Sequence, residues 1–215
     1  LPGIKLSRNL KAVKDMGEAV KGSGIVVIAI PSKHLKASLS SAGSLLDRKM
    51  IIMSLTKGIE TGSFKRPSQI ISEIAPGNPI VALSGPNLSM EIAKGLPAAS
   101  VAASEDISAA KKIQEILSNE RFRIYTSDDI IGVEIGGAMK NVIALAAGIC
   151  DGLNLGNNAK SALIVRGLAE ITRLGTALGA KPETFSGLSG IGDLITTCES
   201  ALSRNHTVGK EIARG

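Results

Sequence analysis

Five short apolar runs in the first 127 residues constrain the fold more than any other feature of the sequence. They are residues 24–30, 50–55, 79–83, 98–103 and 122–125. Each run is rich in Ile, Val or Ala, and segments long enough to form a helix separate them. Strands that are apolar on both faces need cover on both sides, which is typical of a parallel sheet between helices. The sequence therefore predicts an α/β fold.

The strand pattern stops near Thr126. Three helical stretches, about 129–150, 158–178 and 190–214, follow and are joined by Gly- and Asn-rich loops. We therefore expect an α/β domain over residues 1–128 and an all-helical domain over residues 129–215. Because the connection between them is short, the two domains should pack against each other and leave a cleft.

Composition narrows the classes of function. Of the 215 residues, 44% are hydrophobic and 2% are aromatic, and the net charge is +6. The apolar fraction is sufficient for a core, and the scarcity of aromatic side chains argues against a module that stacks nucleobases. Lys and Arg form no continuous block, so the charge indicates a basic surface and no nucleic-acid partner.

Cysteine use and hydropathy bear on the compartment. Cys150 and Cys198 are far apart and lack metal-ligand spacing, so we expect a reducing, cytoplasmic compartment and no bound metal. The longest apolar run, residues 142–150, has nine residues and includes Gly148. It is well short of the ~20 residues that cross a bilayer, so we expect no stable membrane insertion.

Lys140 is the sharpest candidate for a chemically active side chain. On a helix, the positions three, four and seven away from it are all small or apolar, so it lies on the face expected to point inward. A lysine removed from water has a lowered pKa and can exchange a proton near neutral pH. The alternative is that Lys140 has no chemical role: its aliphatic part lies along apolar surface and its ammonium group extends into solvent. Gly136 and Gly137 beside it leave room for a substrate or another backbone.

Two loops after predicted strands carry further candidates. Lys57 lies in a Thr-Lys-Gly sequence after the second strand, where doubly wound folds place ligand contacts. Ser84-Gly85-Pro86-Asn87 follows the third strand and precedes a predicted helix over 88–94, whose free N–H groups can bind an anion. An exposed loop lysine and a simple strand-to-helix turn are the alternatives.

Polar residues near the end of the chain complete the candidates. Asp193 lies among small and apolar residues, where it either caps a helix or accepts a hydrogen bond from a substrate or a lysine. Ser203, Arg204 and Asn205 combine groups that suit a phosphate, with a surface turn as the alternative. His206 can assist them, but we expect a solvated loop histidine.

Taken in order, these motifs resemble those of the bacterial-type NAD(P)-dependent glycerol-3-phosphate dehydrogenase family. The similar sequences cover essentially the whole chain and are LP at 1–2, NL at 9–10, VIAIPS at 27–32, TKGIE at 56–60, LSGP at 83–86, GLP at 95–97, FRIYT at 122–126, GVEIGGAMKNV at 132–142, DGL at 151–153, RGLAE at 166–170, LGTALG at 174–179, PETF at 182–185, GIGDL at 190–194 and SRN at 203–205. Each motif alone is weak, but the ordered set is specific. The resemblance implies part of a Rossmann-like parallel-sheet domain followed by an all-α substrate domain.

The activity implied by the resemblance is hydride transfer between a nicotinamide cofactor, NAD or NADP, and C2 of a three-carbon phosphate. The family interconverts dihydroxyacetone phosphate and sn-glycerol 3-phosphate, which supplies phospholipid synthesis. The resemblance also implies a homodimer.

Roles for individual residues follow from the same resemblance. Lys140 matches the catalytic proton donor, Lys57 a lysine at the cofactor–substrate junction, and Asp193 the carboxylate near the reacting centre. The implied substrate contacts are Lys57, Gly85, Asn87, Lys140, Asn141, Asp193, Thr197, Ser203, Arg204 and Asn205. The implied cofactor contacts are Pro31, Lys57, Ser89 and Arg204.

The sequence also departs from the family pattern. Asn87-Leu88-Ser89 stands where the family has Ser or Thr, then Phe, then Ala, and His206 replaces a usually more basic residue. No GxGxxG is present, and the family's Gly-rich first βα unit should precede Leu1 and its last helical segment should follow Gly215. We therefore expect a chain cut at both ends. The alternatives are another β-hydroxyacid-type dehydrogenase and a non-catalytic fragment or binding module of this fold.

Overall fold

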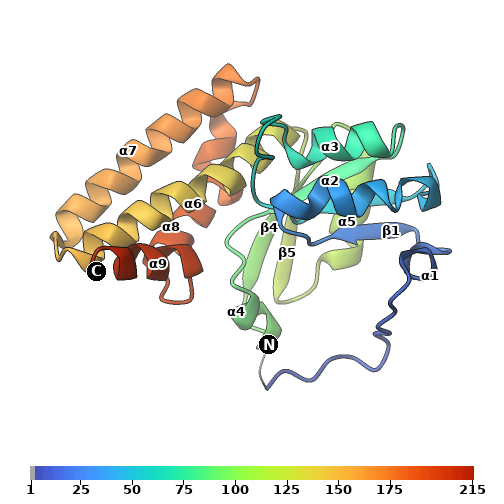
Figure 1. Ribbon diagram of the computed structural model, residues 1–215, viewed down its shortest axis with the longest axis horizontal. Coiled ribbons are helices and arrows are strands. Elements are labelled where there is room, and N and C mark those ends of the chain that lie inside the picture. The colour runs from blue at the N-terminus through green and yellow to red at the C-terminus, as the bar shows by residue number, and fades with distance from the viewer. Residues whose placement is uncertain (1–2) are drawn as a thin grey trace.

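The computed structural model describes residues 3–215 and has two parts that lie side by side (Figure 1). Helices pack on a five-stranded sheet in the first part, and the second part is helical. The long helix α6 (Ile130–Gly152) begins beside the sheet and runs into the helical part, so it belongs to the contact between them. The motif at residues 1–2 lies outside the described residues.

All five predicted strands are present, each within two residues of its predicted bounds. They are β1 (Ile25–Ile28), β2 (Ile51–Ser54), β3 (Ile80–Ser84), β4 (Ala98–Ala103) and β5 (Phe122–Ser127). The helical elements around them are α1 (Met16–Val20), α2 (Ser32–Ser40), the 3₁₀ turn η1 (Gly43–Leu45), α3 (Pro67–Ile74), α4 (Ser89–Ala93) and α5 (Ile107–Leu117).

The strand order is β1-β2-β3-β4-β5, and the sheet is mostly parallel. β1, β2 and β3 run parallel to one another and β4 runs parallel to β5, whereas β3 and β4 are antiparallel with Leu83 opposite Ala102. The α/β fold is thus confirmed, and this one pair departs from the parallel arrangement that we expected. The chain between β3 and β4 holds only the five-residue helix α4. That helix is too short to carry the chain back along the sheet, so the strand reverses direction.

Helices cover both faces of the sheet, as the apolar strands predict. On one face, Leu35 and Leu39 of α2 and Ile70 of α3 are buried against Ile28 and Ile52. The other face of the sheet packs on α5, through the buried side chains of Ala109 and Ile113. Their partners in the strands are Met53, Val81, Ala102 and Ile124. The cover is incomplete at the outer strands, where Val27 of β1 and Tyr125 of β5 are exposed, and ligands of such folds bind at the strand ends.

The helical part begins with α6 and α7 (Gly156–Ala177). It continues through a 3₁₀ turn, η2 (Pro182–Ser186), a π-helical turn, η3 (Leu188–Gly192), and the helices α8 (Asp193–Glu199) and α9 (Arg204–Ile212). The prediction of one helical stretch over 190–214 is therefore wrong. Gly190 has non-helical φ −98° and ψ −105°, and the chain leaves helical geometry again between Glu199 and Arg204.

The helix α6 is long and apolar enough, by length and composition alone, to cross a membrane. The expectation drawn from uninterrupted apolar runs missed this, because the helix interrupts its apolar residues with single polar ones. In the structure 56% of its most apolar stretch is buried inside the protein. It also carries Glu134 and Lys140, both in ion pairs. These features are typical of a core helix.

Candidate active site

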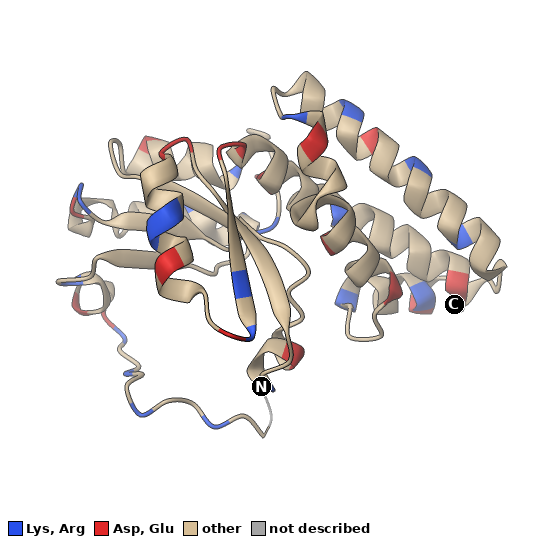
Figure 2. Cartoon of the chain, turned by 180° about the vertical axis from the view of Figure 1, so that it is seen from behind, with Lys and Arg blue, Asp and Glu red and all other residues tan. Residues whose placement is uncertain are grey.

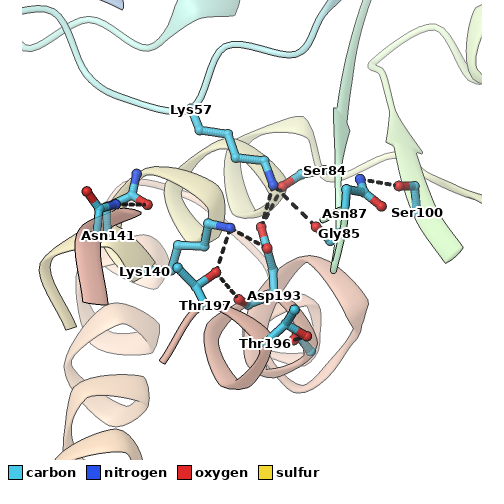
Figure 3. Close-up of polar contacts among 12 residues, drawn as sticks. Lys57, Ser84, Gly85, Asn87, Ser100, Lys140, Asn141, Asp193, Thr196 and Thr197 are labelled. Carbon is cyan, nitrogen blue, oxygen red and sulfur yellow. Dashed lines mark hydrogen bonds and ion pairs between the residues drawn. The ribbon is translucent and has the colours of Figure 1, made fainter. Parts of the chain in front are cut away.

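Lys140 on α6 and Asp193, the first residue of α8, form a buried ion pair (Figure 3). The Lys140 ammonium also donates to the hydroxyl of Thr197 at 2.9 Å, and that hydroxyl donates to the backbone carbonyl of Asp193 at 2.6 Å. Lys140 is 7% exposed and Asp193 is 1% exposed. Since Thr197 follows Asp193 by one helical turn, α8 presents both oxygens to the same ammonium group.

Lys57 reaches the same carboxylate from the α/β part. Its Nζ lies 2.6 Å from Oδ2 of Asp193 and donates to the carbonyl of Gly85 at 3.2 Å. The hydroxyl of Ser84 lies 3.4 Å from the same Oδ2. Lys57 follows β2 and Gly85 follows β3, so the carboxyl ends of two neighbouring parallel strands meet α6 and α8 at this point. Asp193 therefore binds lysines and does not cap α8.

Two glycines of α6 leave the space in which these groups meet. A Cβ atom on Gly136 would lie 2.6 Å from the backbone oxygen of Ser189 in η3, which leads into Asp193. A Cβ atom on Gly137 would lie 2.9 Å from the Ser84 hydroxyl and 3.6 Å from Cγ of Lys57. The room that the sequence predicted is thus taken by the η3 backbone and by the Lys57 side chain.

The electrostatics of the cluster suit proton transfer. Burial, followed by the positive charge of Lys57, lowers the pKa of Lys140 from 10.5 to about 8, and Asp193 opposes that shift. A group with this pKa is present in both protonation states near physiological pH, as a general acid or base requires. Two ammonium groups against one carboxylate leave one net positive charge in the cluster.

Asn87 lies beside the cluster with one polar atom unused (Figure 3). Its amide nitrogen donates to the Ser100 hydroxyl at 2.5 Å, whereas its Oδ1 is buried and has no hydrogen-bond partner among the described residues. A buried acceptor without a partner is destabilising, so this oxygen fits a site that a ligand completes. Gly85 serves packing as well, since a Cβ there would lie 2.9 Å from the backbone oxygen of Ala99.

The Ser-Arg-Asn run opens the helix α9 and does not form a surface turn. The Ser203 hydroxyl accepts from the His206 N–H at 3.3 Å and caps the helix. The Asn205 amide donates to Oδ1 of Asn141 at 2.8 Å, directly beside Lys140 in the sequence of α6. Arg204 is exposed, with no ion pair within residues 3–215. The run is therefore anchored close to the lysine, and Arg204 is available for a ligand.

The prediction of a solvated His206 is wrong. Its side chain is 10% exposed, and its Nε2 lies 2.7 Å from Oδ2 of Asp151 on α6. The backbone explains the burial, because a Cβ on Gly148 would lie 2.0 Å from the carbonyl oxygen of His206. Glycine at this position lets α9 approach α6 so closely that the histidine side chain is enclosed.

Two of the proposed cofactor contacts lie where strands of the sheet end. Pro31 comes just after β1 and Lys57 after β2, so these two residues lie at the carboxyl ends of parallel strands, where dinucleotides bind in doubly wound folds. Pro31 and Ser89 are exposed and make no hydrogen bond to the lysine cluster within residues 3–215. In the same range, no group of three or more His, Cys, Asp or Glu residues could hold a metal ion.

Sequence reasoning missed two contributors to this region. The Ser84 hydroxyl faces Asp193, whereas the sequence indicates only a turn or an anion-binding helix start at this position. Glu134, a carboxylate in the apolar stretch of α6, is 6% exposed and pairs with Arg66. The signal for Glu134 was present in the sequence, because an acidic residue on the inward face of a buried helix needs a partner.

Fold and site together define a class of protein: a dinucleotide-binding type of α/β domain joined to a helical domain, with two lysines and an aspartate where they meet. In Figure 2, Lys and Arg are interspersed with Asp and Glu over both packed parts, whereas the extended segment over residues 3–14, before α1, carries the basic residues Lys5, Arg8, Lys11 and Lys14 and no acidic one. Residues 1–110 match the family description "NAD-dependent glycerol-3-phosphate dehydrogenase N-terminus", and residues 129–215 match the corresponding C-terminus. The chain belongs to the NAD-dependent glycerol-3-phosphate dehydrogenase family, which confirms the resemblance.

Individual relatives agree with this assignment. A glycerol-3-phosphate dehydrogenase [NAD(P)+] of Dehalococcoides mccartyi is 53% identical over 96% of this chain and 58% of its own length. One from Streptomyces coelicolor is 49% identical over 100% of this chain and 65% of its own length. The crystal structure of glycerol-3-phosphate dehydrogenase from Coxiella burnetii superposes with a TM-score of 0.97 at 39% identity, covering 100% of this chain and 66% of that one. The chain thus spans about three fifths of the length of such relatives.

Proposed function

We propose that this chain carries the catalytic centre of an oxidoreductase that interconverts dihydroxyacetone phosphate and sn-glycerol 3-phosphate with NAD(P)H. The observation that carries the proposal is the buried Lys140 ammonium, held by Asp193 and Thr197 and beside Lys57. Family membership supports the substrate class. We also propose the division into an α/β domain over 1–128 and a helical substrate domain over 129–215.

In this proposal Lys140 moves the proton. A nicotinamide cofactor, when bound, would supply the hydride for C2 of the ketone, or would take it up in the reverse direction. The Lys140 ammonium gives its proton to the carbonyl oxygen as the C–O double bond becomes a single bond, and the neutral amine takes that proton back in the oxidation of the alcohol. The lowered pKa of Lys140 keeps both directions available near neutral pH.

Asp193 positions the Lys140 ammonium, and Lys57 stabilises negative charge on the substrate. Asp193 keeps the Lys140 ammonium in place, because it accepts from it while Thr197 accepts the second hydrogen bond. Lys57 adds positive charge where an alkoxide develops, which stabilises that charge in a site shielded from water. The carbonyl of Gly85 holds Lys57 from the opposite side.

The phosphate of the substrate would bind at the start of α9. Arg204 supplies a planar guanidinium for two phosphate oxygens, and Ser203 and Asn205 stand on either side of it with hydroxyl and amide groups. Asn141 belongs to the same group because it accepts from Asn205. The unpartnered Oδ1 of Asn87 is suited to a substrate hydroxyl.

The dinucleotide would lie along the strand ends, near Pro31, Lys57, Ser89 and Arg204. The exposed Pro31 after β1 and the Lys57 side chain after β2 fit such a ligand, which is NAD or NADP. The product would serve phospholipid synthesis. We further propose a cytoplasmic homodimer; the two free cysteines within the described chain fit a reducing compartment, and the homodimer rests on the family resemblance.

The test follows the absorbance of NADPH and of NADH with dihydroxyacetone phosphate, and with phosphate-free dihydroxyacetone as the matched control. We expect oxidation of one cofactor with the phosphorylated ketone and a large loss without the phosphate. Equal rates with both ketones would reject the phosphate site, and turnover of a β-hydroxyacid in their place would indicate the other dehydrogenase class. Binding of the substrate without turnover would indicate a binding module.

A further inference from the structure

A buried acidic residue outside the lysine cluster takes no part in the proposed chemistry. Glu134 lies on α6 and its side chain is 2% exposed. Its carboxylate accepts from Arg66 at 2.5 Å, from the N–H of Ser68 at 2.7 Å and from the hydroxyl of Ser68 at 2.6 Å. Burial raises the pKa of the Glu134 carboxyl, whereas the hydrogen bonds from Ser68 and the charge of Arg66 oppose that shift and hold the side chain in a single position.

These donors stand at the far end of the segment that carries Lys57. The segment leaves β2 after Ser54 and enters α3 at Pro67. At its first end the Thr56 hydroxyl donates to the carbonyl of Ile30 at 2.9 Å, and at its last end Arg66 and Ser68 donate to Glu134. Between these two points Phe64 is 79% exposed and has a positive φ of 56°. The Ile59 side chain also packs against the helical core, and the Glu60 N–H donates to the carbonyl of Lys65 at 3.0 Å, so the exposed part of the segment is limited to residues 61–64.

The same helix carries the anchor and the proposed proton donor. Glu134, Gly137 and Lys140 follow one another at intervals of three residues on α6, and Gly137 is where Lys57 passes the helix. One rigid helix thus sets the distance from the end of the segment to the lysine cluster.

We propose that Glu134 is a positioning residue, which keeps Lys57 against Asp193 by anchoring Arg66 and Ser68 to α6. The inference rests on the proposed function only for the role given to Lys57; the anchoring itself concerns the folded chain. When Glu134 no longer binds Arg66 and Ser68, the segment moves and the ion pair between Lys57 and Asp193 breaks. Asp193 then pairs with Lys140 alone.

The ionisation of Lys140 distinguishes this role from others. The groups that face its ammonium are Lys57, Asp193 and the thiol of Cys198, whose own pKa burial raises to about 11 so that it is neutral. If Glu134→Gln acted only by removing a negative charge, the pKa of Lys140 would fall. If it releases Lys57, a positive neighbour leaves and the pKa of Lys140 rises from about 8.

The experiment measures the Lys140 pKa by NMR of the ¹⁵N-labelled lysine ammonium groups, assigned with Lys140→Met. Variants are Glu134→Gln, the milder Ser68→Ala, and Lys57→Met as the reference for complete release. Glu73→Gln is the matched control, because Glu73 pairs with Lys65, next to Arg66, at the surface. We expect the pKa to rise in the first three variants and to stay unchanged in the control. A fall or no change in both Glu134→Gln and Ser68→Ala would overturn the proposal.

Hydrogen exchange supplies a second readout that needs no turnover. We expect amides of residues 58–66 to exchange about tenfold faster in Glu134→Gln, since a charge-assisted hydrogen bond contributes roughly that factor. Unchanged exchange there would reject the anchor even in a chain that shows dehydrogenase activity. Faster exchange and a raised Lys140 pKa in a chain without turnover would reject the proposed function and keep the anchor.

Discussion

Lys140 and Asp193 are 53 residues apart in the chain and form a buried ion pair between α6 and α8. Lys57, 136 residues before Asp193, binds the second oxygen of the same carboxylate. One aspartate therefore joins two lysines from the two parts of the fold. The two ammonium groups make the site positively charged, which favours an anionic substrate. The carboxylate between them offsets their mutual repulsion.

Removing the shared carboxylate should destabilise the fold. In Asp193→Asn the buried Lys140 ammonium and the partly exposed Lys57 ammonium lose their counter-ion, and breaking a buried pair in this way costs about 3–5 kcal/mol. Urea unfolding measures the loss. Asp128→Asn is the control, because Asp128 pairs with Lys181 at the surface and we expect a change below about 1 kcal/mol. Equal losses in both variants would contradict the account.

The stability of the protein should rise with pH between about 8 and 10.5 through Lys140. Its pKa is lowered from 10.5 to about 8 in the folded state, so over this interval the unfolded chain binds more protons than the folded one. Below pH 8 the folded state bears the full penalty of the buried charge, on the order of 3 kcal/mol. The measurement is the free energy of unfolding of the wild type and of Lys140→Met across this pH range. The rise that Lys140 causes should be absent in the variant.

A close contact between α6 and α9 should fix the proposed phosphate site. A Cβ on Gly148 would lie 2.0 Å from the His206 carbonyl oxygen, so Gly148→Ala must push the two helices apart. We expect a loss of about 1–3 kcal/mol in unfolding free energy. Gly24→Ala serves as the control, because a Cβ there meets nothing within 4 Å. If both alanines were tolerated equally, the close packing would be refuted.

Local sequence patterns predict much of this fold. The five strands and the helix α6 follow from runs of apolar residues and their period, and the inward position of Lys140 follows from its neighbours on that helix. These features depend on residues close in the chain, which is why a single sequence reveals them.

The remaining features depend on contacts between distant segments. The burial of His206 follows from the approach of α9 to Gly148, and the antiparallel β4 follows from a connection too short for a crossover. The pairing of Asp193 with Lys57 and Lys140 joins three segments, so the local sequence left a helix cap and a lysine partner equally open. The roles of these residues came from the family resemblance.

Arg204 should contribute to substrate binding without contributing to stability. It is exposed and forms no ion pair within the described chain, so Arg204→Ala should leave unfolding unchanged. Loss of a charged hydrogen bond to the phosphate should raise KM for dihydroxyacetone phosphate about 10- to 100-fold. Arg214→Ala, also exposed and on the chain just after α9, is the control for general charge. An unchanged KM in Arg204→Ala would reject its assignment.

The rate of ketone reduction in Lys140→Met shows whether Lys140 is the proton donor. The variant keeps an apolar side chain of similar length but has no proton to give. We expect a folded variant whose kcat with dihydroxyacetone phosphate is about 10²- to 10⁴-fold lower, and a wild-type rate of reduction that declines above a pH of about 8 as Lys140 loses its proton. A variant with the kcat of the wild type and the same pH profile would contradict this role of Lys140.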